Sequence, residues 1–278
     1  PLDIVITSSC PESSFLSSRG PGRFWQSGRR LGPGLRSSPI KPLDDSMKPL
    51  THVAWLPVLV FAASTVVADE PRVLFDGTNT DVWEFREGGW SIDDSGFLRC
   101  HIEEVRQKNG NMRTRGMGYI WTRESFEDFE LSLSYKLSEA ANSGVFFRTD
   151  PNNPVQGGFE IQLMDDEGIR RSRSELEAKR LNGALYDCQA ASGNPGRPAG
   201  QWNDLKLTCR GPMIRLEING KTVNEINVDR WDTPMQNPDG SKNKFQTALR
   251  DLPRSGRIGF QNHGQVVWFK DIKIRELD

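Results

Sequence analysis

The chain has 278 residues, and its 36 basic and 37 acidic side chains leave a net charge of −1 at neutral pH. Such a balance provides no field that would attract nucleic acid or an anionic membrane surface. We therefore expect no nucleic-acid partner and favour a small, neutral or weakly charged ligand.

The N-terminal residues 1–46 are rich in Ser, Pro, Gly and Arg and lack an apolar period. This composition is typical of a segment that builds no packed core. We interpret residues 1–46 as a mis-assigned, disordered N-terminal extension, with Met47 as the true first residue.

Residues 47–68 have the three parts of a secretory signal peptide. A positively charged start at Met47 precedes an apolar stretch that ends at Ala63, and Val66 and Ala68 occupy the positions that a signal peptidase reads. The apolar stretch is too short to cross a bilayer. We predict cleavage after Ala68, export to the periplasm or the medium, and no membrane anchor afterwards.

Residues 69–278 are long enough to form one domain with a substantial core. Apolar and polar residues alternate in many short stretches, which indicates antiparallel strands with one face in the core. The clearest stretches are 129–137, 145–148, 159–164 and 205–209.

The clearest turn is Asn219-Gly220, which predicts a tight type I′ hairpin. Two closing strands are expected at 257–262 and 266–274. The charged stretch 165–181 holds either one short helix or a long loop, and 232–252 is expected to be a long loop. Short strands without a βαβ rhythm predict an all-β, antiparallel β-sandwich.

Cys188 and Cys209 form the pair that we would test for a disulfide, since export permits one. Buried, reduced thiols are an equally good interpretation. The cysteine spacings do not match a zinc site.

Polar side chains converge on one predicted sheet face. Glu160 and Gln162 are two residues apart on one strand and project to the same side, beside strands that offer Arg148, Gln261 and His263. A carboxylate, two amides, a guanidinium and an imidazole suit a sugar-binding cleft. Alternatively, Arg148 pairs with Glu160 in a structural salt bridge, and His263 is a hydrogen-bonding turn residue.

Several motifs, in this order along the chain, resemble the 3-keto-disaccharide hydrolase family. They include Leu74-Phe-Asp-Gly-Thr-Asn79, Ala141-Asn-Ser-Gly-Val-Phe-Phe-Arg148, Gly158-Phe-Glu-Ile-Gln-Leu-Met-Asp165 and Ile258-Gly-Phe-Gln-Asn-His-Gly264. The resemblance implies a concanavalin A-like jelly-roll sandwich. It also implies hydrolysis of glycosides already oxidised to a ketone at C3 of the sugar.

The implied reaction assigns roles to the polar residues. A C3 ketone acidifies the C2 proton, so a base can remove it, the C1 substituent leaves by elimination, and water then adds. Glu160 or His263 is the candidate base, and Arg148 or a bound divalent metal would stabilise the enolate oxygen. Asp165 joins this catalytic set through its place in the family motif, although a regular strand points it away from Glu160.

Glu160, Asp165 and His263 could together bind a divalent metal, but the sequence contains no short motif with the spacing of metal ligands. Further side chains are expected to bind the sugar by stacking or hydrogen bonding, although packing and turn roles compete, above all for the tryptophan. They are Asn142, Gln162, Tyr186, Trp202, Asn203 and Gln261.

Two other functions compete with the keto-glycoside hydrolase. A non-catalytic, lectin-like module would use the same fold and the same polar cleft. A retaining glucanase would need two close carboxylates, and this strand has Gln162 where such an enzyme would have an acidic residue. The glucanase is therefore the least favoured of the three.

Overall fold

The computed structural model describes residues 70–172 and 175–278, which belong to one compact unit. The predictions for residues 1–46 and 47–68 lie outside this described part. Within it, no helix has the length and apolar character needed to cross a membrane.

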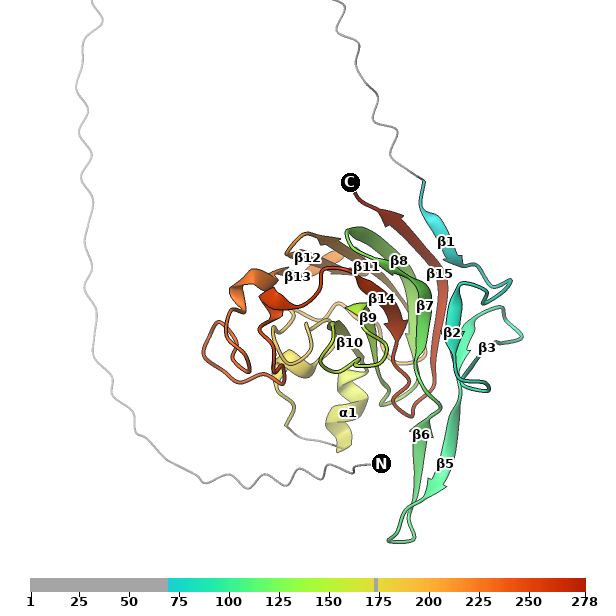
Figure 1. Cartoon of the computed structure of the whole chain (residues 1–278). Coiled ribbons are helices and arrows are strands. Elements are labelled where there is room, and N and C mark those ends of the chain that lie inside the picture. The colour runs from blue at the N-terminus through green and yellow to red at the C-terminus, as the bar shows by residue number, and fades with distance from the viewer. Residues whose placement is uncertain (1–69, 173–174) are drawn as a thin grey trace, which may run out of the picture. The chain divides into compact units, whose positions relative to one another are not determined.

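Two antiparallel sheets make up most of the domain (Figure 1). The larger sheet has the order β13-β12-β11-β8-β15-β4-β3, with β1 also pairing with β15. Its strands are β1 (Arg72–Phe75), β3 (Trp90–Ile92), β4 (Leu98–Cys100), β8 (Phe129–Leu137), β11 (Trp202–Arg210), β12 (Met213–Ile218), β13 (Lys221–Asn227) and β15 (Val267–Glu276).

The smaller sheet has the order β10-β9-β14-β7-β2. Its strands are β2 (Trp83–Phe85), β7 (Ile120–Phe126), β9 (Asn142–Thr149), β10 (Phe159–Met164) and β14 (Gly256–Phe260). A separate ribbon pairs β5 (Ile102–Arg106) with β6 (Met112–Gly116), and the helical segments are α1 (Asp166–Ser172), η1 (Ala178–Arg180), η2 (Val228–Arg230) and η3 (Leu249–Asp251).

Successive strands pass between the sheets: β7 lies in the smaller sheet, β8 in the larger, β9 and β10 in the smaller, and β11 in the larger. Strand β14 likewise lies in the smaller sheet and β15 in the larger. This connection pattern confirms the predicted all-β, antiparallel jelly-roll sandwich of the concanavalin A-like class.

Strand β10 shows how the predicted alternation becomes structure. Phe159, Ile161 and Leu163 belong to the core between the sheets. Glu160 and Gln162 therefore point outward from the smaller sheet, but they too are buried. The outward face of β10 must consequently be covered by other parts of the chain.

Residues 183–186 extend the smaller sheet beside β10. The backbone N–H of Tyr186 donates to the carbonyl of Glu160 at 2.9 Å, and Leu185 bridges to Ile161. Since Leu185 shares the core with Ile161, Tyr186 lies on the outward face. This segment therefore brings an aromatic side chain next to Glu160.

The predicted hairpin is confirmed. Asn219 and Gly220 have φ values of 50° and 73° and join β12 to β13, as a type I′ turn requires. The closing strands also form, as β14 and β15. The stretch 165–181 contains both α1 and η1, and 232–252 is a long loop that includes η3.

The three cysteines in the described residues are buried and free. Of the two interpretations left open for Cys188 and Cys209, the structure therefore has the buried, reduced thiols and not the disulfide. Burial raises the pKa of Cys209 to about 12 and that of Cys100 to about 11, so both thiols stay protonated and act as small core residues.

Candidate functional site

Glu160 is a buried, hydrogen-bonded polar residue on the outward face of the smaller sheet. Its Oε1 accepts a hydrogen bond from Nε2 of Gln261 at 3.1 Å, and its Oε2 lies 3.5 Å from Nζ of Lys244. The glutamate side chain is only 6% exposed. It is thus held from two sides, by an amide on the chain after β14 and by an ammonium on the 232–252 loop.

Burial raises the pKa of Glu160 to about 7, because the cost of removing the carboxylate from water exceeds the stabilising attraction of Lys244. A carboxyl group with this pKa exchanges its proton near neutral pH. This is the property expected of a general base rather than of a permanently charged structural residue.

Gly144 makes room for the Glu160 carboxylate. It lies on neighbouring β9, where the register pairs it with Gln162, and an added Cβ would come within 2.4 Å of Oε1 of Glu160. Any side chain here would therefore displace the carboxylate. The glycine of the Asn-Ser-Gly motif is therefore required at this position, because it leaves the space that the Glu160 carboxylate occupies.

Lys244 and Tyr186 cover Glu160. Nζ of Lys244 lies 4.4 Å from the centroid of the Tyr186 ring, in a cation–π contact. Tyr186 was expected to be a sugar contact, whereas Lys244 was not identified from sequence. It lies in a long loop without periodicity, where a lysine normally indicates only solvent exposure.

An aromatic patch adjoins the carboxylate on the same face. The ring of Phe146 lies 5.4 Å from that of Tyr119 and 5.3 Å from that of Trp121. Gly259 lies beneath Trp121, whose ring occupies the place where a Cβ would project. Phe146 and Trp121 are buried, whereas Tyr119 is half-buried, so Tyr119 is the ring of this patch that the C–H face of a sugar could contact.

Tyr119 and Gln261 connect the patch to Glu160. Burial raises the pKa of Tyr119, and the nearby Glu160 charge raises it further, while a hydrogen bond with Gln261 opposes the rise. Oε1 of Gln261 is buried and has no hydrogen-bond donor in the described residues. This oxygen is thus a buried acceptor beside Glu160 that lacks a partner in the described residues, and it presents no surface to a ligand.

Gln162 and Asn142 form a second polar pair on this face. Nε2 of Gln162 donates to Oδ1 of Asn142 at 3.0 Å. Their register, with Gln162 opposite Gly144 and Met164 opposite Asn142, places them one step along the strands from Glu160. Four of the residues expected to bind sugar, Asn142, Gln162, Tyr186 and Gln261, therefore gather around Glu160.

Arg148 does not join them. Its fully buried guanidinium donates to the carbonyls of Glu127 and Gly211 and forms an ion pair with Asp128 at 2.8 Å. This corrects the expectation that Arg148 lies beside Glu160, either as an enolate partner or in a salt bridge. A side chain with no exposed surface cannot touch a substrate.

Asp165 and Asn203 belong to a different region, where both line a cavity of about 120 Å³. Asp165 directly precedes α1, and its carboxylate accepts from the backbone N–H of Ala140 at 2.8 Å. Oδ1 of Asn203 accepts from the backbone N–H of Arg197 and from the side chain of Asn219. Both expected site residues are thus engaged in local loop structure.

Trp202 lies on the larger sheet. Its ring is 4.8 Å from that of Phe97, and Nζ of Lys136 lies 5.0 Å from its centroid. Its strand neighbours Asn203 and Leu205 are buried, so Trp202 points outward from this sheet. The core therefore separates Trp202 from Glu160, which corrects its expected place in the cleft.

His263 lies beyond the end of β14, and its side chain is exposed. Within the described residues, no three His, Cys, Asp or Glu side chains come together in a way that could hold a metal ion. The suggested ligand set of Glu160, Asp165 and His263 is therefore not assembled.

Comparison with known proteins places this geometry in context. Residues 70–275 match the family described as the 3-keto-alpha-glucoside-1,2-lyase-like domain. A 3-keto-disaccharide hydrolase from Bacteroides thetaiotaomicron is 26% identical over 238 residues, which cover 77% of this chain and 80% of that protein.

Solved structures agree with this match. A candidate glycosyl hydrolase from Parabacteroides distasonis has a TM-score of 0.65 and 30% identity, covering 75% of this chain and all 100% of that one. A second candidate glycosyl hydrolase from the same organism has a TM-score of 0.56 and 22% identity, covering 74% and 93% of the two chains, and supports the fold alone.

Proposed function

The chain belongs to the 3-keto-alpha-glucoside-1,2-lyase-like domain family, and from this premise we propose that it hydrolyses 3-keto-glycosides by elimination and hydration, with Glu160 as the base. Its similarity to named hydrolases supports a glycoside-cleaving enzyme at the family level. The observation that carries the finer proposal is the buried Glu160 carboxyl, whose pKa is raised to about 7.

The proposed first step is proton removal from C2 of the oxidised ring. The Glu160 carboxylate takes the proton, and the C–H electron pair moves to the C3 ketone oxygen to form an enolate. The ammonium of Lys244, 3.5 Å from Glu160, is the positive charge positioned to stabilise that oxygen. Lys244 thereby takes the role that the sequence had suggested for Arg148.

The enolate then expels the C1 substituent. Its electrons form the C1–C2 double bond as the C1–O bond breaks, and the leaving oxygen needs a proton. Tyr119, whose pKa is raised by burial and therefore stays protonated at neutral pH, is the candidate donor. Water then adds to C1 and a proton returns to C2, so the net reaction is hydrolysis.

Sugar binding in this proposal uses the surroundings of Glu160. The half-buried ring of Tyr119, packed against Trp121 and Phe146, would contact an apolar sugar face. Export directed by residues 47–68 remains part of the proposal, because an exported enzyme would meet glycosides outside the cytoplasm.

A direct assay tests the function. The purified protein is incubated with a 3-keto-glycoside and with its unoxidised parent, with and without a chelator. We expect release of the leaving group from the keto substrate alone, and at least 100-fold slower release by Glu160→Gln, which corresponds to the typical contribution of about 10²–10⁴ from a general base.

Other outcomes would contradict the proposal in distinct ways. Tight binding of both sugars without turnover would indicate a lectin-like module instead. Full activity of Glu160→Gln would remove Glu160 as the base and make His263→Ala the next variant to measure. Loss of activity with chelator, restored by added metal, would show that a metal supports the reaction.

A further inference from the structure

Asp166, the first residue of α1, is a buried carboxylate that forms no ion pair with any residue in the described part of the chain. Its oxygens accept only from uncharged groups, Oδ1 from the backbone N–H of Asn182 at 3.0 Å and Oδ2 from Nδ2 of Asn194 at 2.9 Å. Burial raises its pKa, although these hydrogen bonds and the charge of Arg170 oppose the rise. A buried carboxylate without a counter-charge is costly, so a cation at this point would stabilise the fold.

Asp166 lines a cavity of about 120 Å³, and Asp165 and Tyr135 line it too. Tyr135 on β8 lies directly opposite Asn203 on β11, and both are buried. The cavity therefore lies where the core between the sheets ends and the chain around α1 begins. A space of this size with polar walls accommodates several water molecules, or an ion with part of its hydration shell.

The hydroxyl of Tyr135 is a second, independent indication of a bound group. Tyr135 is 1% exposed, and its hydroxyl oxygen is buried without a hydrogen bond to any described residue. The nearby Asn182 side chain is engaged elsewhere, because its Oδ1 accepts from the backbone N–H of Met164 and its Nδ2 donates to Asn194. Since buried hydroxyls in native proteins nearly always have a partner, the cavity should contain one for Tyr135.

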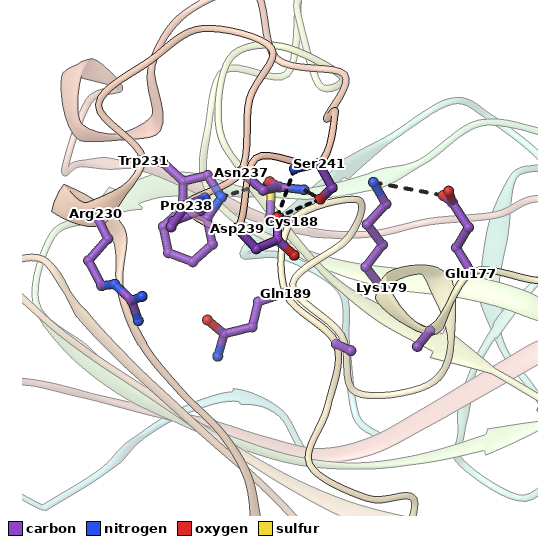
Figure 2. Close-up of a pocket in the computed structure, with 12 residues that line it drawn as sticks. Glu177, Lys179, Cys188, Gln189, Arg230, Trp231, Asn237, Pro238, Asp239 and Ser241 are labelled. Carbon is purple, nitrogen blue, oxygen red and sulfur yellow. Dashed lines mark hydrogen bonds and ion pairs between the residues drawn. The ribbon is translucent and has the colours of Figure 1, made fainter. Parts of the chain in front are cut away.

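The larger pocket between the segments 177–190 and 230–241 lacks such a signal (Figure 2). Figure 2 shows the indole of Trp231 bonded to Asn237, Asp239 bonded to Ser241, and Lys179 paired with Glu177. No buried nitrogen or oxygen of that pocket lacks a partner within the described residues. Buried groups that require a ligand are therefore a property of the smaller cavity.

We propose that the cavity at the start of α1 binds a calcium ion, with the carboxylates of Asp165 and Asp166 as its charged ligands and an ion-bound water as the partner of Tyr135. The other walls include the side-chain amides of Asn182 and Asn194, whose oxygens can serve as neutral ligands. Calcium accepts six to eight oxygen ligands of these types in a flexible geometry. Zinc and copper prefer imidazole or thiolate, and neither histidine nor cysteine lines this cavity.

The ion would connect β10 and α1 to the segment that covers Glu160. Asn182, which donates its backbone N–H to Asp166, directly precedes the residues 183–186 that run beside β10 and carry Tyr186. Calcium would thus stabilise this cover without contacting the Glu160 carboxylate. The inference stands independently of the proposed reaction.

Calcium binding by the purified full chain, treated with a chelator and then dialysed, tests the proposal. Calorimetric titration with calcium chloride should show saturable binding of one ion per chain. Millimolar calcium should raise the Tm by at least about 3 °C, because a ligand that binds only the folded state stabilises it. Asp166→Asn should weaken calcium binding at least about tenfold through the lost ligand charge, whereas Asp94→Asn, at an exposed position, should bind calcium like the wild type.

Absence of saturable binding by the folded wild type would overturn the proposal. So would a rise in Tm that sodium chloride of equal ionic strength reproduces, since that result would indicate charge screening alone. Unchanged calcium affinity in Asp166→Asn would place the ion elsewhere and contradict the assignment. If Asp166→Asn does not fold, Asp165→Asn takes its place with the same expected result. These measurements do not use the reaction, so their failure is distinguishable from failure of the proposed function.

Discussion

Glu160 shows how far one residue's chemistry depends on its neighbours. Its side chain points outward from a sheet, where a carboxylate would normally be solvated and titrate near its ordinary pKa. Instead, Lys244, Tyr186 and Gln261 enclose it. The pKa is raised to about 7 because desolvation outweighs the attraction of the single cation.

The pH dependence of activity follows from this balance. If Glu160 acts as the base, kcat/KM should rise with pH and level off above about 7, the pKa of Glu160 in the free enzyme. Lys244 lowers that pKa, so Lys244→Met should move the acidic limb of the profile to higher pH. Lys242→Met, an exposed lysine two residues away, should leave the limb in place. An unmoved limb in Lys244→Met would contradict this coupling.

The same carboxyl group should also make stability depend on pH. Because the pKa of Glu160 is about 7 in the folded state and 4.5 in the reference state, the folded protein binds more protons between these values and loses stability as pH rises through them. The full difference corresponds to about 3 kcal/mol.

Thermal unfolding of Glu160→Gln checks this linkage, because the amide does not titrate. Its Tm relative to the wild type should increase between pH 5 and pH 8. Glu87→Gln, at an exposed position, serves as the control. Parallel Tm profiles for the wild type and Glu160→Gln would show that burial does not raise this pKa.

At the scale of elements, Arg148 joins three parts of the sandwich. From β9 in the smaller sheet it reaches Glu127 and Asp128, between β7 and β8, and Gly211, between β11 and β12. Asp128 also accepts from the backbone N–H of Gly211 at 2.9 Å. The conspicuous arginine of the Phe-Phe-Arg motif therefore stabilises the packing of the sheets.

Arg148→Ala should accordingly destabilise the protein without changing its chemistry. Removing one member of a buried ion pair costs about 3–5 kcal/mol, and denaturant unfolding would measure the loss. The folded protein should keep its kcat/KM, while Arg210→Ala should retain both stability and activity. A stable but inactive Arg148→Ala protein would instead make Arg148 part of the site.

For the whole molecule, the sandwich divides the expected residues among separate regions. Glu160, Gln162 and Gln261 share the outward face of the smaller sheet, whereas Trp202 lies outward on the larger one. Asp165 and Asn203 lie around a third region near the start of α1. The core between the sheets, to which Cys209 belongs, keeps the two outward faces apart.

The state of the core cysteines provides a test at this scale. Cys100, Cys188 and Cys209 are free, so a reductant should leave the Tm unchanged. Alkylation of the denatured, unreduced protein, followed by peptide mass spectrometry, should modify all three. Recovery of a linked peptide containing Cys188 and Cys209 would contradict the structure.

Much of the fold was predictable because it depends on local pattern. Alternation along 129–137 and 159–164 predicted β8 and β10, and Asn219-Gly220 predicted the hairpin, since side-chain direction and turn geometry are set by adjacent residues. The same alternation placed Glu160 and Gln162 on one face. Lys244 could not be found in this way, because the sequence of a loop does not show which part of the fold the loop will contact.

The sequence by itself determined that the described domain is an antiparallel sandwich and that Glu160 projects from a strand beside polar neighbours. Only the tertiary structure decided that Lys244 and Tyr186 cover this carboxylate, that Arg148 turns toward Asp128, and that Trp202 lies across the core. The physical reason is the distance along the chain over which each property is determined. Strand periodicity is a property of neighbouring residues, whereas burial, ion pairing and pKa depend on segments brought together from distant parts of the chain.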